Sequence, residues 1–301
     1  MRRTVLKRSE LFWNLLFPPF CLACDLPLDP RESDPLCPVC RSRYAAEREF
    51  LCPECRKPHR ICSCLPARMR RVSPFALHIG EYSGEEESVV RALILSAKDH
   101  NYEALHRFMA AELCAAFSQR EDFGAFSENC LVTYVPRARE KVAERGVDQA
   151  RETAKRLARL LNCRFVKTLS HKKSRQQKKL SAGERLQNAS GGYALLPHMS
   201  DKLKGEFAGK TLLLYDDVVT TGATMAVCAS LLKRAGAASI VYLSFGMTYR
   251  QSKAPPASVL RKESGKAAGR RAGPGRAQKI TRDCETIRRY PGSTEEEGDS
   301  K

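Results

Sequence analysis

The residues of this chain best suited to chemistry stand in one stretch, TLLLYDDVVTTGATM, at residues 211–225. Its apolar start is typical of a buried strand, which would deliver the adjacent acids Asp216 and Asp217 to the sheet edge where open α/β sheets bind ligands. The following loop supplies hydroxyls and a glycine: Thr220, Thr221, Gly222 and Thr224. Such a loop can surround a phosphate with backbone amides, while carboxylates suit sugar hydroxyls, directly or through Mg²⁺. The whole stretch therefore favours a ribose 5-phosphate site over an Asp-rich turn with a threonine helix cap.

A second candidate for chemistry is a run of paired cysteines. Eight of the thirteen cysteines form four closely spaced pairs: Cys21 and Cys24, Cys37 and Cys40, Cys52 and Cys55, Cys62 and Cys64. Two such pairs complete a tetrahedral site, and four thiolates leave no position for a substrate water, so we predict structural zinc rather than catalytic zinc or redox chemistry. The pairing stays open: two ions bound in sequence order, two bound in an interleaved order, or one ion held by four of the eight.

Length and charge limit the kind of protein. The 301 residues suffice for an α/β domain plus a smaller module, and the formal net charge of +18 favours a polyanionic or phosphorylated partner. The segment from Gln251 is rich in Gly, Pro and Ala and carries twelve Lys/Arg against seven Asp/Glu, which predicts a disordered basic tail. No apolar run approaches the roughly 18 residues of a membrane span, and no signal cleavage site follows the basic start. We therefore expect a cytoplasmic protein without a membrane partner.

Hydrophobic periodicity predicts alternating strands and helices in the middle of the chain. Expected strands cover 78–84 with its turn, 130–136, 163–170, 211–217 and 239–247, and expected helices cover 85–97, 102–119, 147–162 and 223–235. This alternation predicts an α/β domain with a doubly wound, mostly parallel sheet over residues 66–250. Residues 1–65 are expected to form a short helix at 11–17 and a zinc ribbon module, and residues 251–301 the tail.

Several stretches of the sequence resemble those of known protein families. LLLYDDVVTTGAT (212–224) resembles the phosphoribosyl pyrophosphate (PRPP) motif of type I phosphoribosyltransferases. Three further stretches resemble the ComF competence family, in the family's order: LLFPPFCLAC (15–24), ERGVDQARETAKRLA (144–158) and QQKKLSAGERLQNASGGY (176–193). The resemblance covers residues 11–248. It implies a type I phosphoribosyltransferase domain behind a double zinc ribbon, and a link to natural transformation.

The resemblance also implies roles for residues. Asp216 and Asp217 would be the catalytic pair that holds the ribose hydroxyls and Mg²⁺. The full PRPP-binding set that it implies is Lys98, Arg137, Arg145, Asp216, Asp217, Val218, Thr220, Thr221, Gly222, Ala223 and Thr224. Arg139 and Lys141 lie near the same pyrophosphate position, with ordinary surface charge as the alternative. The polar segment with Lys172, Lys173, Arg175 and Gln176 resembles the flexible loop that covers the active site in these transferases, and a basic surface loop is the alternative.

Some residues depart from the family pattern, and the function has more than one candidate. Val147 and Asp148 replace the usual Phe and Asn, Tyr215 replaces a small aliphatic residue, and the last cysteine pair is CxC. The first hypothesis is a Mg²⁺-dependent phosphoribosyltransferase with an unidentified acceptor, which supports DNA uptake. The alternatives are a non-catalytic adaptor that binds single-stranded DNA and a competence helicase, and a PRPP-sensing regulator. An aromatic content of 7% argues against an extended base-stacking surface.

Overall fold

The computed structural model describes residues 18–31, 33–59, 62–73, 75–82, 87–99, 103–120, 129–171 and 192–249. These residues form two compact units that divide between Tyr44 and Ala45, inside helix α2 (Pro38–Glu49). Change in composition predicts a boundary after residue 65, but the compact unit that holds the sheet also includes the cysteines from Cys52 to Cys64. The helix at 11–17, the loop with Lys172, Lys173, Arg175 and Gln176, and the tail from Gln251 lie outside the described residues.

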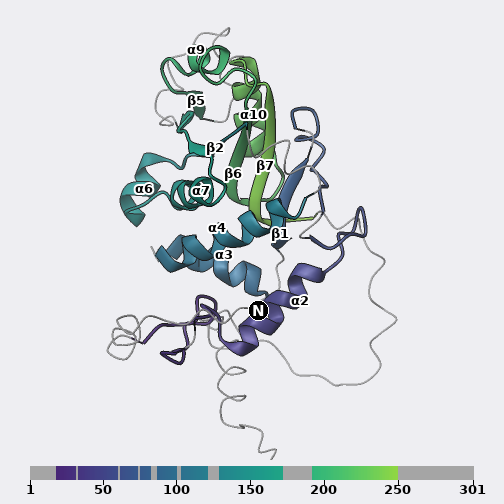
Figure 1. Cartoon of the computed structure of the whole chain (residues 1–301), viewed down its shortest axis with the longest axis vertical. Coiled ribbons are helices and arrows are strands. Elements are labelled where there is room, and N and C mark those ends of the chain that lie inside the picture. The colour runs from purple at the N-terminus through teal and green to yellow at the C-terminus, as the bar shows by residue number, and fades with distance from the viewer. Residues whose placement is uncertain are drawn as a thin grey trace, which may run out of the picture. The chain divides into compact units, whose positions relative to one another are not determined.

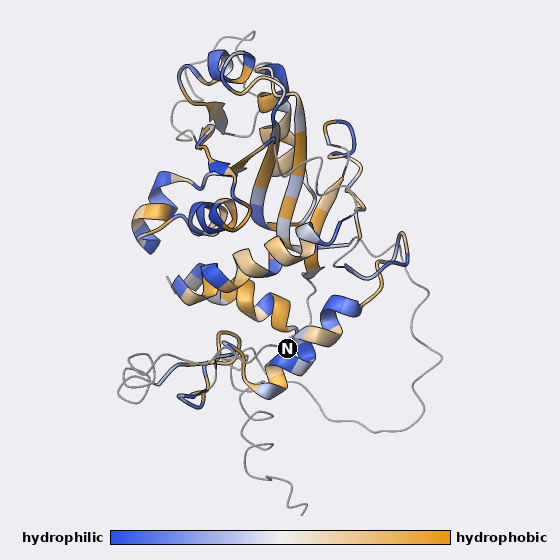
Figure 2. Ribbon diagram, viewed as in Figure 1, coloured by the Kyte–Doolittle hydropathy of each residue, from blue (hydrophilic) through white to orange (hydrophobic). Residues whose placement is uncertain are grey.

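The unit that begins at Ala45 is built on a five-stranded parallel sheet with the strand order β1-β7-β6-β2-β3 (Figure 1). Its strands are β1 Ala76–Glu81, β2 Cys130–Tyr134, β3 Arg164–Phe165, β6 Thr211–Val219 and β7 Ser239–Met247. The two longest strands, β6 and β7, are buried along almost their whole length, as a sheet covered on both faces requires. Hydrophobic residues concentrate on these central strands (Figure 2). The predicted fold class is confirmed.

Helices cover both faces of this sheet. Helices α3 (Val89–Asp99), α4 (Glu103–Ser118) and α7 (Gln149–Leu160) pack on one side, and α10 (Ala223–Arg234) packs against β6 and β7. Leu212 and Leu214 share a core with α10, so the alternate residues Leu213 and Tyr215 face the other layer. No described helix is long and apolar enough to cross a membrane.

Several elements differ from the expected pattern. The expected strand at 163–170 is two short strands, β3 and β4 (Leu169–His171), and β4 pairs antiparallel with β5 (Tyr193–Leu195) in a separate small sheet. Three described helices lie outside the expected ones: α2, α6 (Arg139–Arg145) and α9 (Met199–Lys204). The last two are too short for a periodic apolar face to mark them. Cys130 and Cys163, at the starts of β2 and β3, form a disulfide.

The end of α2 holds the start of α3, the helix that carries Lys98. The Glu47 carboxylate accepts hydrogen bonds from the Val89 and Val90 amides, at 2.6 and 2.9 Å. It also accepts one from the Ser88 hydroxyl at 3.1 Å. A carboxylate at a helix amino terminus satisfies free N–H groups and favours the helix dipole, so α3 begins at a fixed place.

Candidate functional site

The acid pair lies near the carboxyl end of β6. Asp217 is 7% exposed, and its Oδ2 atom accepts a hydrogen bond from Arg137 Nη2 at 2.6 Å. The Lys98 ammonium lies 3.8 Å from the same oxygen. Three chain segments far apart in the sequence therefore meet at one carboxylate: the end of α3, the loop after β2, and β6. This cluster of one acid and two cations sits at the edge where parallel sheets bind ligands.

The position of Arg137 depends on contacts of its own loop. After β2 ends, the Val135 amide donates to the Tyr215 carbonyl at 2.9 Å, which keeps the chain beside β6. The Arg137 amide then donates to Asp148 Oδ2 at 3.2 Å. Asp148 also caps α7, because its other oxygen accepts from the Arg151 amide at 3.4 Å. In the sequence Asp148 stands out only as a departure from the family pattern, but an acid directly before QARETAK is the helix-cap signal that could have revealed this role.

Burial and like charge perturb the acid pair. Burial, followed by the neighbouring Asp217 carboxylate, raises the pKa of Asp216 well above its ordinary value of 3.8. Burial alone would lower the pKa of the Arg137 guanidinium, but the carboxylates of Asp217, Asp216 and Asp148 raise it. Two adjacent carboxyls with one raised pKa are suited to bind a divalent cation or sugar hydroxyls, since either would relieve the repulsion between them.

The raised pKa of Asp216 predicts an effect on stability. In the unfolded chain this carboxyl ionises as the pH passes about 4, whereas the folded state still favours the protonated form, so the parent loses stability as the pH rises toward the folded-state pKa. Asp216→Asn should remove this loss and raise the free energy of unfolding at neutral pH by about 1 kcal/mol. Urea unfolding between about pH 4 and pH 8 measures it.

Asp217→Asn is the matched comparison for that measurement. It leaves the Arg137 guanidinium, whose side chain is 19% exposed, without its carboxylate partner, so we expect lower stability at neutral pH. If Asp216→Asn retained the pH dependence of the parent, the pKa of Asp216 would be unperturbed and the description of the pair would be wrong.

The loop after β6 begins helix α10. Gly222 is the N-cap residue, with a left-handed φ of 70° that suits glycine. Thr220, Thr221 and Thr224 are exposed at this helix start, and Thr221 Oγ1 accepts a hydrogen bond from the Ala223 amide at 3.4 Å. The amino terminus of a twelve-residue helix therefore follows directly from the acid pair. Exposed hydroxyls, amides and a helix dipole at one place are suited to a phosphate group.

The remaining predicted cations lie on α6. Arg139 and Lys141 are exposed, and Arg145 is half-buried at the end of that helix. The Nη1 atom of Arg145 is buried without a hydrogen-bond partner among the described residues. Within that part of the chain, the ion pairs of Asp217 are with Arg137 and Lys98. The structure thus brings Arg137 and Lys98 to the acid pair and leaves the three α6 cations outside this contact.

The cysteines form two groups in sequence order. The first cluster is Cys21, Cys24, Cys37 and Cys40; the second cluster is Cys52, Cys55, Cys62 and Cys64. Within each cluster all four Sγ atoms lie within 4.8 Å of one another, which suits one tetrahedral ion per cluster. Of the pairings that the sequence left open, this arrangement supports two sites in sequence order.

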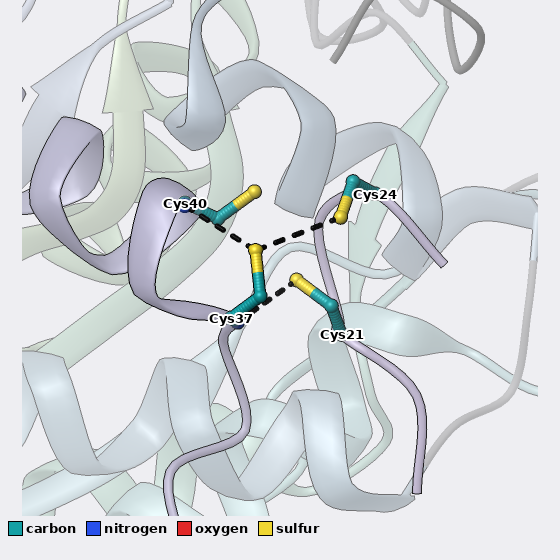
Figure 3. A group of neighbouring side chains, drawn as sticks. All are labelled: Cys21, Cys24, Cys37 and Cys40. Carbon is teal, nitrogen blue, oxygen red and sulfur yellow. Dashed lines mark hydrogen bonds between the residues drawn. The ribbon is translucent and has the colours of Figure 1, made fainter. Parts of the chain in front are cut away.

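The first cluster has the local geometry of a metal site (Figure 3). The Cys37 amide donates to Cys21 Sγ at 3.3 Å, and the Cys24 and Cys37 sulfurs lie 3.9 Å apart. A hydrogen bond from the Cys24 thiol is the main cause that lowers the pKa of Cys21 to about 7. Sulfurs that accept amide hydrogen bonds and face one another are suited to bind zinc as thiolates.

The second cluster repeats this local fold in spite of its CxC pair. Asp25 and Arg56, the residues after Cys24 and Cys55, both have left-handed φ values, of 57° and 59°. An isolated antiparallel β-bridge closes each turn: Phe20 pairs with Pro27, and Leu51 pairs with Pro58. The Cys64 amide donates to Cys62 Sγ at 3.3 Å, and both sulfurs of the CxC pair lie within 4.8 Å of the other two sulfurs of the cluster. Both clusters therefore fit a structural zinc ion.

The chain is similar to proteins named for DNA use, for competence and for phosphoribosyl transfer. Residues 142–263 match the family model described as phosphoribosyl transferase domain. The DNA utilization protein YhgH of Escherichia coli O6:H1 is 29% identical over 236 residues, which cover 75% of this chain and 96% of that protein. The competence protein ComFC of Bacillus subtilis strain 168 is 26% identical over 243 residues, covering 73% and 91%. A hypoxanthine phosphoribosyltransferase structure from Staphylococcus aureus overlays on 53% of this chain and on 71% of its own chain. The TM-score of 0.28 and the sequence identity of 14% are too low for this overlay to bear on the site.

Proposed function

We propose that this chain, which is similar to the YhgH and ComFC proteins and matches the phosphoribosyl transferase domain model over residues 142–263, is a ComF-like protein that binds PRPP with Mg²⁺ at the carboxyl edge of its sheet. The observation that carries the proposal is the contact of Asp217 with both Arg137 and Lys98, directly ahead of the glycine loop that begins α10. The carboxylates are suited to ribose hydroxyls, the two cations to a diphosphate and the start of α10 to a monophosphate, which supports the proposal.

Each part of PRPP has a candidate partner in this arrangement. Asp216 and Asp217 would hold the ribose hydroxyls and Mg²⁺, and the backbone of Val218 and of residues 220–224 would surround the 5-phosphate. Arg137 and Lys98 would turn from Asp217 to the pyrophosphate, whose charge is larger than that of one carboxylate. Arg145, with its unpartnered buried nitrogen, is the next candidate for that charge.

The reaction that such a site would support is displacement of pyrophosphate from carbon 1 of the ribose. The carbon–oxygen bond to pyrophosphate breaks and a bond to the nitrogen of an acceptor amine or base forms. The electron pair leaves with pyrophosphate, and the proton of the acceptor passes to solvent. Arg137 and Lys98 would stabilise the departing charge electrostatically, and bound Mg²⁺ would neutralise more of it.

We also propose that the protein acts in DNA uptake or use, as the names of its relatives suggest for those proteins. The net charge of +18 supports a polyanionic partner. The alternatives remain an adaptor for single-stranded DNA and a competence helicase, and a PRPP sensor without transfer. An adaptor would bind single-stranded DNA with strong salt dependence, unaffected by loss of the acid pair.

Calorimetric titration of PRPP with Mg²⁺ into the full chain tests the proposal. The parent should bind, and Asp216→Asn/Asp217→Asn should lose on the order of 100-fold or more in affinity, because both hydroxyl and cation contacts disappear. The double variant is accepted only if circular dichroism and zinc content match the parent. A folded, zinc-loaded parent that does not bind would contradict PRPP binding and favour the DNA adaptor.

A further inference from the structure

A cleft of about 220 Å³ lies beside the glycine loop, at the same edge of the sheet as the acid pair. Its lining comes from residues 64–68, 220–221 and 247–249, together with Glu54. Cys64 of the second cluster and the hydroxyls of Thr220 and Thr221 therefore line one cleft. Cys64 of the second cluster therefore lies beside the loop proposed to hold the 5-phosphate, which its sequence position, far ahead of β6, does not indicate.

The segment that follows Cys64 packs directly against the glycine loop. A Cβ atom added at Gly222 would lie 2.5 Å from Met69 Sδ and 3.2 Å from Pro66 Cβ, so these side chains touch the glycine backbone. Met69 is fully buried and shares a core with Leu65 and α10. At its far end, the Ser73 hydroxyl hydrogen-bonds to the Ile240 carbonyl at 2.5 Å. The segment is thus held at one end by the sheet and at the other by the second cluster.

A buried polar network ties the second cluster to the end of β7 as well. The Tyr249 hydroxyl lies 2.5 Å from His78 Nε2, 3.2 Å from His59 Nδ1 and 3.8 Å from Cys62 Sγ. Both histidines are fully buried, His78 on β1 and His59 between the two cysteine pairs. Tyr249 also lines the cleft. The cluster therefore contacts the ligand edge on two sides, through the segment after Cys64 and through Tyr249.

We propose that a metal ion in the second cluster positions the loop at residues 220–224, so that ligand affinity at this loop depends on occupation of the second cluster and not of the first. Leu65, Pro66 and Met69 transmit the effect: with Cys64 released from the ion, the segment loses one of its two attachments and no longer fixes Gly222. Pro66 and Met69 are thus positioning residues. The part of the proposal that concerns ligand affinity rests on the proposed function; the part that concerns loop order does not.

Two matched variants test this in the full chain. Cys55→Ser disables the second cluster at a residue that does not line the cleft, and Cys37→Ser disables the first cluster. Hydrogen exchange of the peptide covering residues 219–226 reports loop order, and titration of PRPP with Mg²⁺ reports affinity. In Cys55→Ser we expect this peptide to exchange roughly tenfold faster, and PRPP to bind roughly tenfold more weakly, than in the parent. Cys37→Ser should stay close to the parent in both measurements.

Linkage requires the reciprocal effect. PRPP with Mg²⁺ should raise the affinity of the protein for one zinc equivalent by a similar factor, as measured by competition with a zinc-selective chelator. The affinity for the other equivalent should not change. Unchanged loop exchange in Cys55→Ser would overturn the proposal. If the parent failed to bind PRPP while its loop exchange still responded to Cys55→Ser, the proposed ligand would be wrong and the positioning role would stand.

Met69→Ala covers the case in which Cys55→Ser fails to fold. It removes the contact with Gly222 but no metal ligand, so both zinc equivalents should remain while loop exchange rises. Met109→Ala provides a matched truncation on α4, because Met109 is as buried as Met69 and does not line the cleft. Loop exchange in Met69→Ala no faster than in Met109→Ala would contradict the role of the segment.

Discussion

Cys37→Ser should release one of two zinc ions and unfold the unit that ends at Tyr44, while the sheet unit keeps its fold. Within the described part of that unit, the buried apolar side chains other than the cluster cysteines are Leu22, Leu26, Leu28, Leu36 and Tyr44. So small a core cannot hold a fold without a metal or another staple. A structural zinc site contributes about 10 kcal/mol or more, so loss of one thiolate outweighs all other contacts of this unit.

Elemental analysis and limited proteolysis measure this outcome. Zinc content should fall from two equivalents to one, and new cleavage sites should appear before residue 45. Cys114→Ser is the control, because Cys114 is a half-buried cysteine on α4 outside both clusters. It should keep both ions. Two retained equivalents in Cys37→Ser would refute the assignment of the first cluster.

Gly222→Ala should destabilise the sheet unit and abolish tight ligand binding. A left-handed φ of 70° costs an alanine about 1 kcal/mol, and the close approach to the buried Met69 and rigid Pro66 should add about 1–3 kcal/mol of overpacking. Relief of that clash would move the loop that begins α10, so we expect affinity for PRPP to fall on the order of 100-fold. Urea unfolding and calorimetry measure the two effects.

The chain offers a close control for this substitution. Gly209 has nearly the same backbone angle, φ 75°, but an added Cβ would meet nothing within 4 Å. Gly209→Ala should therefore show the backbone cost alone, with unchanged binding. Gly222→Ala combined with Met69→Ala should recover part of the stability that Gly222→Ala loses through overpacking. Equal losses in Gly222→Ala and Gly209→Ala would mean that Met69 and Pro66 do not restrict the loop.

The sequence alone determined the features that depend on local spacing. A single stretch carries the strand, the acid pair and the glycine loop, and β6 and α10 lie where its periodicity predicts them. The four closely spaced cysteine pairs likewise predict zinc sites from local spacing, and the structure then brings these pairs together as two groups in sequence order. The alternation of strands and helices was enough to predict the parallel sheet, because strands that alternate with helices are typical of parallel sheets. The apolar period of each element marks the face that is buried.

Only the tertiary structure decided which distant residues share the site. Strand order places β2 beside β6 and so brings the loop after β2 to Asp217. The hydrogen bonds of that loop to Tyr215 and Asp148 hold Arg137 at the carboxylate, whereas Arg139 and Lys141 lie exposed on α6. The tertiary structure also sets Cys64 of the second cluster beside Thr220 and Thr221, although composition assigns that cluster to a separate module. Hydrophobic periodicity indicates which face of an element is buried, but it does not indicate which other element packs on that face. That choice depends on strand register and packing across the whole sheet.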